Sequence, residues 1–290
     1  MSDLALDIRG LSKTYRGFAL RDVSFSLPRG YVMGLIGPNG AGKTTIVKLV
    51  MNLVAREAGE IRVFGHDSVG DEAAVKSRIG FVYDEPRFYD DATLEDHRRA
   101  FAGFYPAWSD ATFDRLARRF ELPRGQKFKT LSNGMKRKFA LLLALSHGAD
   151  LLILDEPTSG LDPVFRREFL ELVGEALQDE GKSVLFSTHI TSDLERIADF
   201  VTLVDRGRVV FSLGRDELAD GWALVKGDDR VIDAVAPAAR RGVRRGPYGV
   251  EVLTSDAAAA RRALGPDAVV ERASLDDVMV LMTRGDRHAA

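Results

Sequence analysis

A glycine-rich segment near the N-terminus has the residue types and spacing needed to hold a chain of phosphates. The pattern G-x-x-x-x-G-K-[ST] is matched in full by Gly37, Pro38, Asn39, Gly40, Ala41, Gly42, Lys43 and Thr44. Its glycines let backbone N–H groups turn toward phosphate oxygens, and the helix that follows presents its positive dipole end to the same anion. Lys43 would neutralise the β- and γ-phosphates, and Thr44 would offer its hydroxyl to Mg²⁺. We expect Thr45 to contact the nucleotide as well. A chance glycine turn is the bland alternative, which the apolar run before the segment and the helical pattern after it disfavour.

Two acidic residues follow an apolar run in the middle of the chain. Leu151 to Leu154 predicts a buried strand, and Asp155 and Glu156 come directly after it. A carboxylate at this point can lie beside a nucleotide's metal, so Asp155 is the expected metal ligand. Glu156 is the expected general base or water-positioning group, a role that typically contributes about 10²–10⁴-fold in rate. The alternative is a strand that ends in an ordinary acidic turn.

His189 follows another apolar strand pattern, Ser183 to Ser187. A histidine at such a sheet edge could reach a γ-phosphate, although a lone histidine is more often structural. Its position after the Asp155–Glu156 strand favours the functional interpretation. The other histidines lack such a context and are expected to be surface or packing residues: His66, His97, His147 and His288.

The segment Leu131–Met135 reads Leu-Ser-Asn-Gly-Met and precedes an apolar helical pattern. Ser132 is a good N-cap, and together with Gly134 it could offer a hydroxyl and bare backbone N–H groups to a phosphate at a helix start. Taken alone, this segment is better interpreted as an ordinary capped helix. The basic residues at 136–138 oppose the helix dipole, an effect that either a bound anion or a solvated basic face would offset.

The composition is that of a soluble globular protein: the chain has 290 residues, of which 45% are hydrophobic and 29% charged. A net charge of −2 gives no reason to expect a nucleic-acid partner. The absence of cysteine excludes disulfides, thiolate metal sites and a cysteine nucleophile. No stretch approaches the roughly 20 apolar residues that span a bilayer, and the N-terminus lacks a signal-peptide pattern. We therefore expect a cytoplasmic chain with no direct membrane span of its own.

Alternating strand and helix patterns predict an α/β core with a largely parallel sheet. Strands are expected at 4–8, 20–27, 31–36, 61–64, 79–82, 151–154 and 183–187, with a hairpin at 200–210, and helices at 44–54, 164–178 and 192–198. A strongly charged helical stretch at about 84–148 is interpreted as a subdomain inserted in a domain spanning 1–214. Residues 215–290 are expected to form a small α/β appendage, with strands at 222–226, 250–254 and 269–272 and a helix at 257–264.

As an ordered set, these segments resemble the ATP-binding subunits of ABC transporters. The phosphate loop, the signature segment 131–135 and the Asp155–Glu156 strand occur in the family's order. Pro157–Asp162 resembles the D-loop, His189 resembles the switch histidine, and Tyr15 resembles the aromatic residue that stacks on adenine. The resemblance implies the P-loop NTPase fold of the ABC type.

The resemblance, which covers roughly residues 4–213, also implies ligands and partners. ATP and Mg²⁺ would be bound in a head-to-tail dimer with a second ATPase subunit of the same or a different kind. Each ATP would lie between the phosphate loop of one chain and Ser132 and Gly134 of the other, with Asp162 nearby. ATP would close the dimer and hydrolysis would reopen it, which would drive a transmembrane permease subunit by population shift. The implied function is the ATPase of a membrane transporter, most similar to the exporter (ABC-2-type) subgroup and held at the inner face of the cell membrane by its permease.

A soluble ABC-type ATPase that serves an assembly or scaffold complex, without membrane subunits, is the alternative function. A role in DNA repair or translation is less favoured, because such relatives usually carry coiled-coil or zinc insertions or tandem nucleotide domains. The sequence has none of these features.

The sequence departs from the family pattern in the signature and after the strand at 79–82. Asn133 and Met135 stand where Gly and Gln are commonest, which is tolerable because Ser132 and Gly134 remain. Asp84 stands where the family usually has Gln; an ionised Asp can only accept hydrogen bonds, whereas Gln also donates. We expect Asp84 to lie near Mg²⁺ in the ATP state as a metal ligand, and the alternative places it outside the site.

Four aromatic residues follow the helical spacing i, i+3, i+4 and i+7: Phe101, Phe104, Tyr105 and Trp108. Such a stripe usually belongs to a core. The family resemblance implies instead a groove for a short cytoplasmic helix of the membrane subunit. Partial exposure of the stripe would favour the groove, and full burial would exclude it.

Overall fold

Short apolar runs form the strands at the centre of the molecule, because such runs can bury both faces of a sheet. The computed structural model describes residues 3–178, 182–247, 249–264 and 269–284. Its largest sheet has six strands in the order β10-β9-β3-β8-β7-β6, all parallel except β10. These strands are β3 (Val32–Ile36), β6 (Ile79–Val82), β7 (Leu151–Asp155), β8 (Ser183–Thr188), β9 (Phe200–Asp205) and β10 (Arg208–Gly214). The α/β core that the sequence predicts is confirmed.

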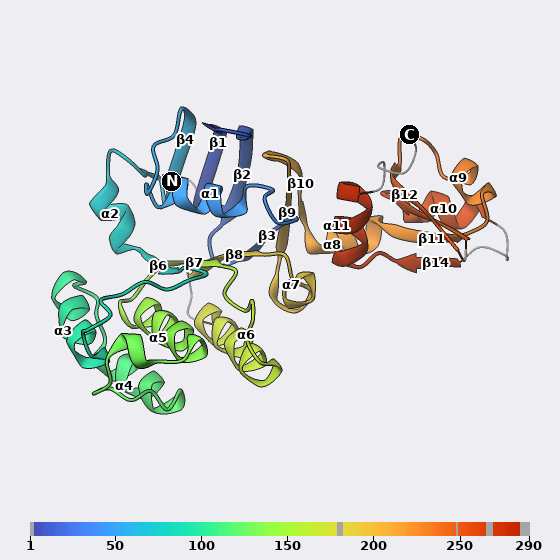
Figure 1. Cartoon of the computed structure of the whole chain (residues 1–290). Helices are drawn as coiled ribbons and strands as arrows, with labels where there is room; N and C mark the ends of the chain where they lie inside the picture. The colour runs from blue at the N-terminus through green and yellow to red at the C-terminus, as the bar shows by residue number, and fades with distance from the viewer. Residues whose placement is uncertain (1–2, 179–181, 248, 265–268, 285–290) are drawn as a thin grey trace.

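The N-terminal strands form a separate antiparallel sheet in the order β2-β1-β4-β5. They are β1 (Leu4–Tyr15), β2 (Phe18–Pro28), β4 (Ala58–Val63) and β5 (His66–Asp67). Buried and exposed residues alternate along β2, as expected for a sheet with one face in water. The sequence pattern predicts strands here but not that they build a second sheet. Helix α1 (Lys43–Val50) lies between the two sheets, as Figure 1 shows.

The two faces of the six-stranded sheet pack against different layers. Along β7, Leu151 and Ile153 belong to the buried cluster that includes α1, whereas Leu152 and Leu154 belong to the cluster that includes the helices on the other face. In Figure 1 those helices lie below the sheet, away from α1. They include α5 (Asn133–Ser146), α6 (Pro163–Leu177) and α7 (Thr191–Ile197). Both clusters together hold the carboxyl ends of the central strands in place.

The stretch after β6 is mainly helical, as its charged pattern predicts. It contains α3 (Leu94–Phe104), α4 (Asp110–Arg119), a 3-10 turn (Phe128–Thr130) and α5, while the short α2 (Glu72–Ser77) precedes β6. The side chains of Thr93, Ser109 and Ser132 cap α3, α4 and α5 by accepting a backbone N–H from the first turn. Because α5 packs directly on β6, these helices are anchored to the sheet.

Residues after Gly214 build a four-stranded antiparallel sheet in the order β12-β13-β11-β14. The elements are α8 (Arg215–Gly221), β11 (Ala223–Gly227), α9 (Arg230–Ala234), β12 (Arg240–Gly246), β13 (Gly249–Thr254), α10 (Ala257–Ala263), β14 (Val269–Arg272) and α11 (Leu275–Arg284). The βαββαβ order from β11 to β14 is the ferredoxin-like arrangement. The sequence patterns indicate β11, β13, α10 and β14 but not α8, α9, β12 or α11.

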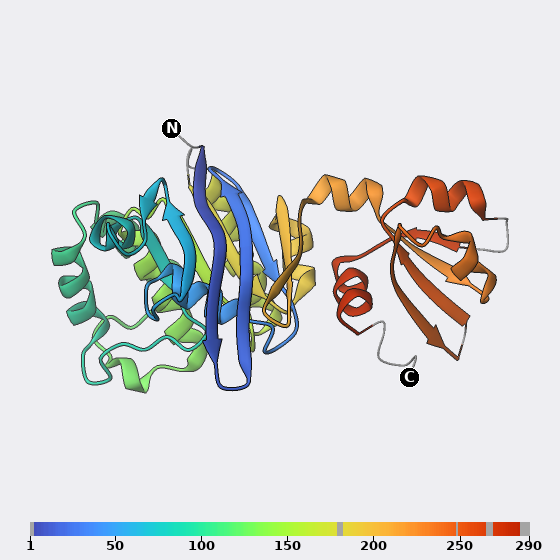
Figure 2. The same cartoon turned by 90° about the horizontal axis from the view of Figure 1, so that it is seen from above.

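This appendage lies at one end of the molecule, beyond β10 (Figure 2). The Trp222 ring packs against Phe211, with ring centroids 5.5 Å apart. Helix α11 packs on α7, and the Leu275 N–H donates to Glu195 Oε1 at 2.9 Å. A continuous apolar cluster therefore joins the appendage to the core.

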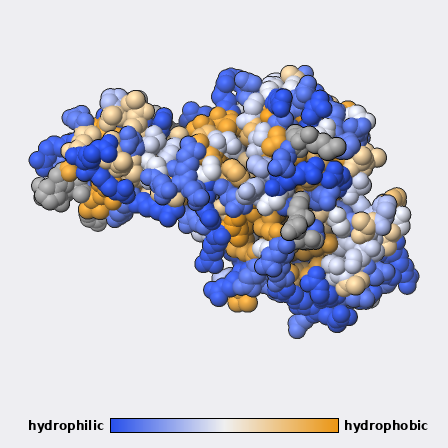
Figure 3. All heavy atoms as spheres, turned by 180° about the vertical axis from the view of Figure 1, so that it is seen from behind, coloured by the Kyte–Doolittle hydropathy of each residue, from blue (hydrophilic) through white to orange (hydrophobic). Residues whose placement is uncertain are grey.

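The surface seen from behind is mostly hydrophilic, with hydrophobic side chains in separate patches on the core and on the appendage (Figure 3). No helix in the described part of the chain is both long enough and apolar enough to cross a membrane.

Gly207 offers a test of how tightly the hairpin β9–β10 is packed against β2. Its φ is +75°, and a Cβ added there would lie 1.9 Å from the Ala19 carbonyl oxygen. We expect Gly207→Ala to lower the free energy of unfolding by more than the ~1–2 kcal/mol of the left-handed backbone alone. Gly65→Ala is the matched control, because its φ is +85° and its Cβ would meet no atom within 4 Å. Equal urea midpoints of the two variants, measured by circular dichroism, would contradict this packing.

Candidate nucleotide site

The glycine-rich loop connects β3 to α1 through residues with positive φ. The φ angles of Gly37, Gly40 and Gly42 are +154°, +78° and +116°, and a Cβ on Gly37 would approach the Val204 carbonyl oxygen to 2.1 Å. Gly42 is the N-cap of α1, and no side chain caps this helix. The first N–H groups of α1 are therefore left for a ligand, which is the arrangement that binds anions.

The side chains of Lys43, Glu156 and His189 meet beside this loop. Lys43 is 5% exposed; its ammonium donates to the Gly37 carbonyl oxygen at 2.7 Å and lies 3.3 Å from Glu156 Oε1. The other Glu156 oxygen, Oε2, lies 2.8 Å from His189 Nδ1. Glu156 has a φ of +48°, a conformation that non-glycine residues seldom adopt and that often marks functional positions. These residues follow β3, β7 and β8, three adjacent strands whose carboxyl ends share one sheet edge.

Asp155 ends β7 and is completely buried. Its Oδ1 accepts a hydrogen bond from the Ser187 hydroxyl at 2.9 Å, while its Oδ2 is buried without a partner among the described residues. Burial raises the pKa of Asp155, and hydrogen bonds from Ser187 and Thr44 counteract this rise. A buried carboxylate oxygen without a partner is costly unless a cation or donor reaches it.

The side chains of Asp155 and Thr44 fit Mg²⁺, because this ion prefers oxygen ligands and is usually shared between one or two carboxylates and substrate phosphates. Within the described residues, no three His, Cys, Asp or Glu side chains are close enough together to hold a metal on their own.

A cavity of about 680 Å³ opens over the loop. It is lined by Gly17, Phe18, Asn39, Gly40, Ala41, Gly42, Lys43, Thr44, Thr45, Asp84, Glu156, Ser159 and His189. Most of the predicted loop residues and both predicted catalytic residues therefore share one cavity. Ser159 belongs to the predicted D-loop stretch, whereas Gly17 and Phe18 are not among the residues predicted from the sequence. The approach of the Phe18 ring to Gly42 follows from the hairpin fold and has no local sequence signal.

Several predicted site residues lie outside this cavity lining. Tyr15 is 40% exposed and lies near the Lys13 ammonium, 5.7 Å from the ring centroid. Asp162 is the N-cap of α6 and accepts the N–H groups of Val164 and Phe165, both at 3.0 Å. Pro38 and Gly37 shape the loop through their carbonyl oxygens, which accept from Lys43. The nucleotide contacts of Tyr15 and Asp162 stay predictions.

Ser132 and Gly134 begin α5, away from the chain's own phosphate loop. The Ser132 hydroxyl accepts the Met135 N–H at 3.2 Å, and its side chain faces solvent. The basic residues that follow each have a partner. The ammonium of Lys136 lies 5.2 Å from the Phe128 ring centroid, that of Lys138 lies 4.4 Å from the Phe165 ring centroid, and Arg137 pairs with Asp84. These contacts reduce the conflict between the three cations and the helix dipole.

Asp84 lies just past β6 at the rim of the cavity. Its Oδ1 accepts a hydrogen bond from Arg137 Nη2 at 2.9 Å. Burial raises the pKa of Asp84, Arg137 lowers it, and the Glu156 and Glu85 carboxylates raise it further. The carboxylate therefore faces α5, and its contact with Mg²⁺ stays a prediction.

Comparisons with known proteins agree with this geometry. The family model described as ABC transporter matches residues 20–159. The lantibiotic transport ATP-binding protein SrtF of Streptococcus pyogenes is 34% identical, over 71% of this chain and 89% of that protein. The Nod factor export ATP-binding protein I of Rhizobium johnstonii is 33% identical, over 72% of this chain and 69% of that protein. A solved ATP-binding subunit of an ABC transporter superposes with a TM-score of 0.68 at 32% identity, covering 74% of this chain and 91% of its own. The chain belongs to the ABC transporter family, as an ATP-hydrolysing subunit that powers a membrane transporter.

Proposed function

We propose that residues 1–214 form an ATPase unit that binds Mg²⁺–ATP in the cavity over residues 37–45 and drives an exporter. The observation that carries this proposal is the position of Glu156 between Lys43 and His189 at the cavity wall. Export is supported by the relative named for Nod factor export. Residues 215–290 are proposed as a separate small domain.

Lys43 and Glu156 form an ion pair at the cavity wall. Phosphate oxygens would compete for the Lys43 ammonium, which would leave Glu156 bonded to His189. Glu156 would then accept a proton from a water molecule, whose oxygen bonds to the γ-phosphorus while the bond to the bridging oxygen breaks. The products are ADP and inorganic phosphate. Mg²⁺, held by Thr44 and Asp155, would neutralise charge on the phosphates.

The second half of the site would come from another copy or a related subunit. Ser132 is exposed and Gly134 is half-buried, and neither lines the cavity of its own chain. The start of α5 has no acidic residue in its first turn, so its N-terminal N–H groups are compatible with a phosphate. A head-to-tail dimer would bring this helix start to the partner's ATP.

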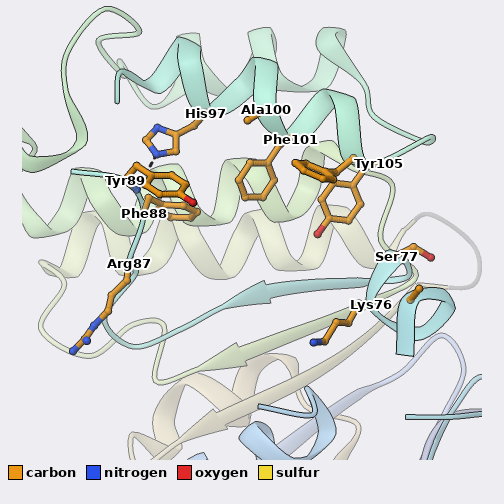
Figure 4. A pocket seen from close by; sticks show the side chains of 11 residues that line it. Lys76, Ser77, Arg87, Phe88, Tyr89, His97, Ala100, Phe101 and Tyr105 are labelled. Atoms are coloured by element: carbon orange, nitrogen blue, oxygen red, sulfur yellow. Dashed lines mark hydrogen bonds between the residues drawn. The ribbon is translucent and has the colours of Figure 1, made fainter. Parts of the chain in front are cut away.

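A second cavity, beside α3, is the proposed permease contact. Its volume is about 740 Å³, and its aromatic lining consists of Phe88, Tyr89, His97, Phe101, Phe104 and Tyr105. Figure 4 shows His97, Phe101 and Tyr105 extending from the α3 region toward this space, with Lys76 and Arg87 on its other side. Apolar surface with basic residues opposite suits a short amphipathic helix that carries acidic residues at its edge.

The aromatic stripe predicted from sequence is split between this groove and the core. Phe104 is 82% exposed, and Phe101 packs against the buried cluster. Trp108 lies beyond α3; its indole donates to Asp110 Oδ1 at 2.8 Å and its ring packs near Phe113. Partial exposure favours docking of a permease, which would hold the chain at the inner face of the membrane.

Replacing Glu156 tests the proposed base. Glu156→Gln should lower ATP turnover by about 10²–10⁴-fold and leave ATP binding intact, because the amide cannot accept the water's proton. With ATP, the variant should accumulate as a dimer in light scattering. Glu60→Gln, an exposed carboxylate on β4, is the matched control. Turnover of Glu156→Gln at the wild-type rate would refute the assignment.

Replacing Ser132 tests the shared site. Ser132→Arg should reduce turnover by about 10²-fold or more while the chain still binds ATP at its own loop. Mixing this variant with Lys43→Ala should restore activity, since the hybrid dimer contains one intact composite site. Thr130→Arg, an exposed position just before the signature, is the control. Loss of ATP binding by the Ser132→Arg monomer would place the residue in its own chain's site instead.

Phe104→Glu tests the groove. The charge should weaken association with a multi-span membrane protein by about 2 kcal/mol or more, the scale of an interface hot spot, and leave ATP affinity unchanged. Val269→Glu, at a 51% exposed apolar side chain of the appendage, is the control. Detergent co-purification measures the effect. Equal recovery of the membrane protein with both variants, or recovery of only a soluble complex with the unaltered chain, would argue against permease docking at α3.

A further inference from the structure

Arg137 ties the start of α5 to the residue that follows β6. Its Nη2 donates to Asp84 Oδ1 at 2.9 Å, and its Nε and Nη2 donate to the Asp84 carbonyl oxygen at 3.3 and 3.1 Å. The Arg137 side chain is 14% exposed and that of Asp84 is 46% exposed. Among the described residues, the hydrogen bonds of the Arg137 side chain all go to Asp84. The guanidinium thus holds one carboxylate oxygen of Asp84 together with the backbone carbonyl of the same residue.

Asp84 borders two cavities. One is the nucleotide cavity, where it lies with Lys43, Thr44 and Glu156. The other has a volume of about 730 Å³ and is lined by Asp84, Asn133, Lys136, Arg137 and Gly160, among others. The carboxylate can therefore turn to the phosphate loop or to the signature helix without crossing the core.

Two other side chains that line the nucleotide cavity are already engaged. Lys43 and His189 both contact Glu156. Asp155 Oδ2, in contrast, is buried without a partner among the described residues. A cation at this oxygen would attract Asp84 as a second carboxylate, and Asp84 Oδ1 would then lose its contact with Arg137.

We propose that Arg137 is a positioning residue that competes with magnesium for the Asp84 carboxylate, so that arrival of the metal–nucleotide releases the side-chain ion pair between the start of α5 and Asp84 and leaves only the bonds to the Asp84 carbonyl oxygen. The inference rests on the proposed function, because it requires Mg²⁺–ATP in the nucleotide cavity. Arg137 lies three residues after Gly134 on the same helix. The release therefore acts on the helix start that would serve the partner's ATP, and it links one chain's metal to the other chain's phosphate contact.

The test is the effect of Mg²⁺ on the affinity of the full chain for a fluorescent, non-hydrolysable ATP analogue. Affinity is measured with Mg²⁺ and with EDTA, and the ratio is compared between variants. Arg137→Gln should raise this ratio about two- to fivefold, the range for a partly exposed ion pair, because the metal no longer competes with the guanidinium. Lys136→Gln removes a neighbouring charge that lies over Phe128 and should leave the ratio unchanged.

Asp84→Asn completes the cycle. This substitution should lower the ratio, and Arg137→Gln should then have no further effect on it. The inference is overturned if Arg137→Gln changes the affinity ratio no more than Lys136→Gln does. It is also overturned if Arg137→Gln changes the ratio by the same factor with and without Asp84→Asn. Arg137→Lys keeps the charge but cannot bond the Asp84 carboxylate and carbonyl oxygens in the same way. It should give an intermediate rise and serves if the glutamine variant does not fold. A chain that binds no nucleotide in either buffer would refute the proposed function itself.

A distance measurement reports the release directly. The chain has no cysteine, so spin labels can be attached at Glu60→Cys on β4 and Arg115→Cys on α4, both exposed positions. The Mg²⁺-bound analogue should shift the distance distribution of the otherwise unaltered chain. Arg137→Gln should show part of that shift without nucleotide, and a nucleotide-free distribution identical to that of the unaltered chain would overturn the inference.

Discussion

The ion contacts of Glu156 with Lys43 and His189 are the interaction around which the rest of the structure is arranged. These residues lie far apart in the chain and meet because β3, β8 and β7 are parallel neighbours that end at one edge. A carboxylate held this far from water needs its charge balanced, and the Lys43 ammonium supplies that balance while His189 Nδ1 contacts the other carboxylate oxygen. The apolar clusters on both faces of the sheet fix the strand ends, so the site inherits its geometry from the core.

The nucleotide residues could be predicted because each motif is local. A glycine loop between a strand and a helix, or an acidic pair after an apolar run, carries its own geometry in a few consecutive residues. Contacts between distant segments have no such signal: Arg137 and Asp84 are 53 positions apart. Tyr15 and Phe18 face each other across the β1–β2 hairpin, and the path of that turn brings Phe18 to Gly42. Because successive side chains of a strand point to opposite faces, a shift of one position moves an aromatic ring to the other face. The aromatic pattern alone does not determine which face each ring occupies.

The limits of periodicity are clearest at α3 and β12. The spacing of Phe101 to Trp108 indicates one helix face, but Tyr105 precedes a proline, adopts extended angles of φ −113° and ψ 110°, and ends the helix. The stripe thereby divides into a groove and a core contact.

In β12 the sequence RRGVRRG does not look like a strand, yet Arg244 pairs with Glu251 across the sheet and Arg245 pairs with Asp229. One cross-strand ion pair, and a second one to the N-cap residue of α9, stabilise an edge that charge patterning would assign to a loop.

The basic run at the start of α5 shows how a local conflict can serve the site. Cations in the first turns of a helix interact unfavourably with its dipole, and a different contact offsets this interaction at each position. Lys136 lies over the Phe128 ring and Lys138 over the Phe165 ring of α6, and neither ring lines the nucleotide cavity. Arg137 instead reaches Asp84 at the nucleotide cavity, a partner that a metal can remove. Of the three cations, only Arg137 thus has a negative partner that depends on what the nucleotide site holds. A phosphate of the partner's ATP at Ser132 and Gly134 would again place a negative charge at this helix start.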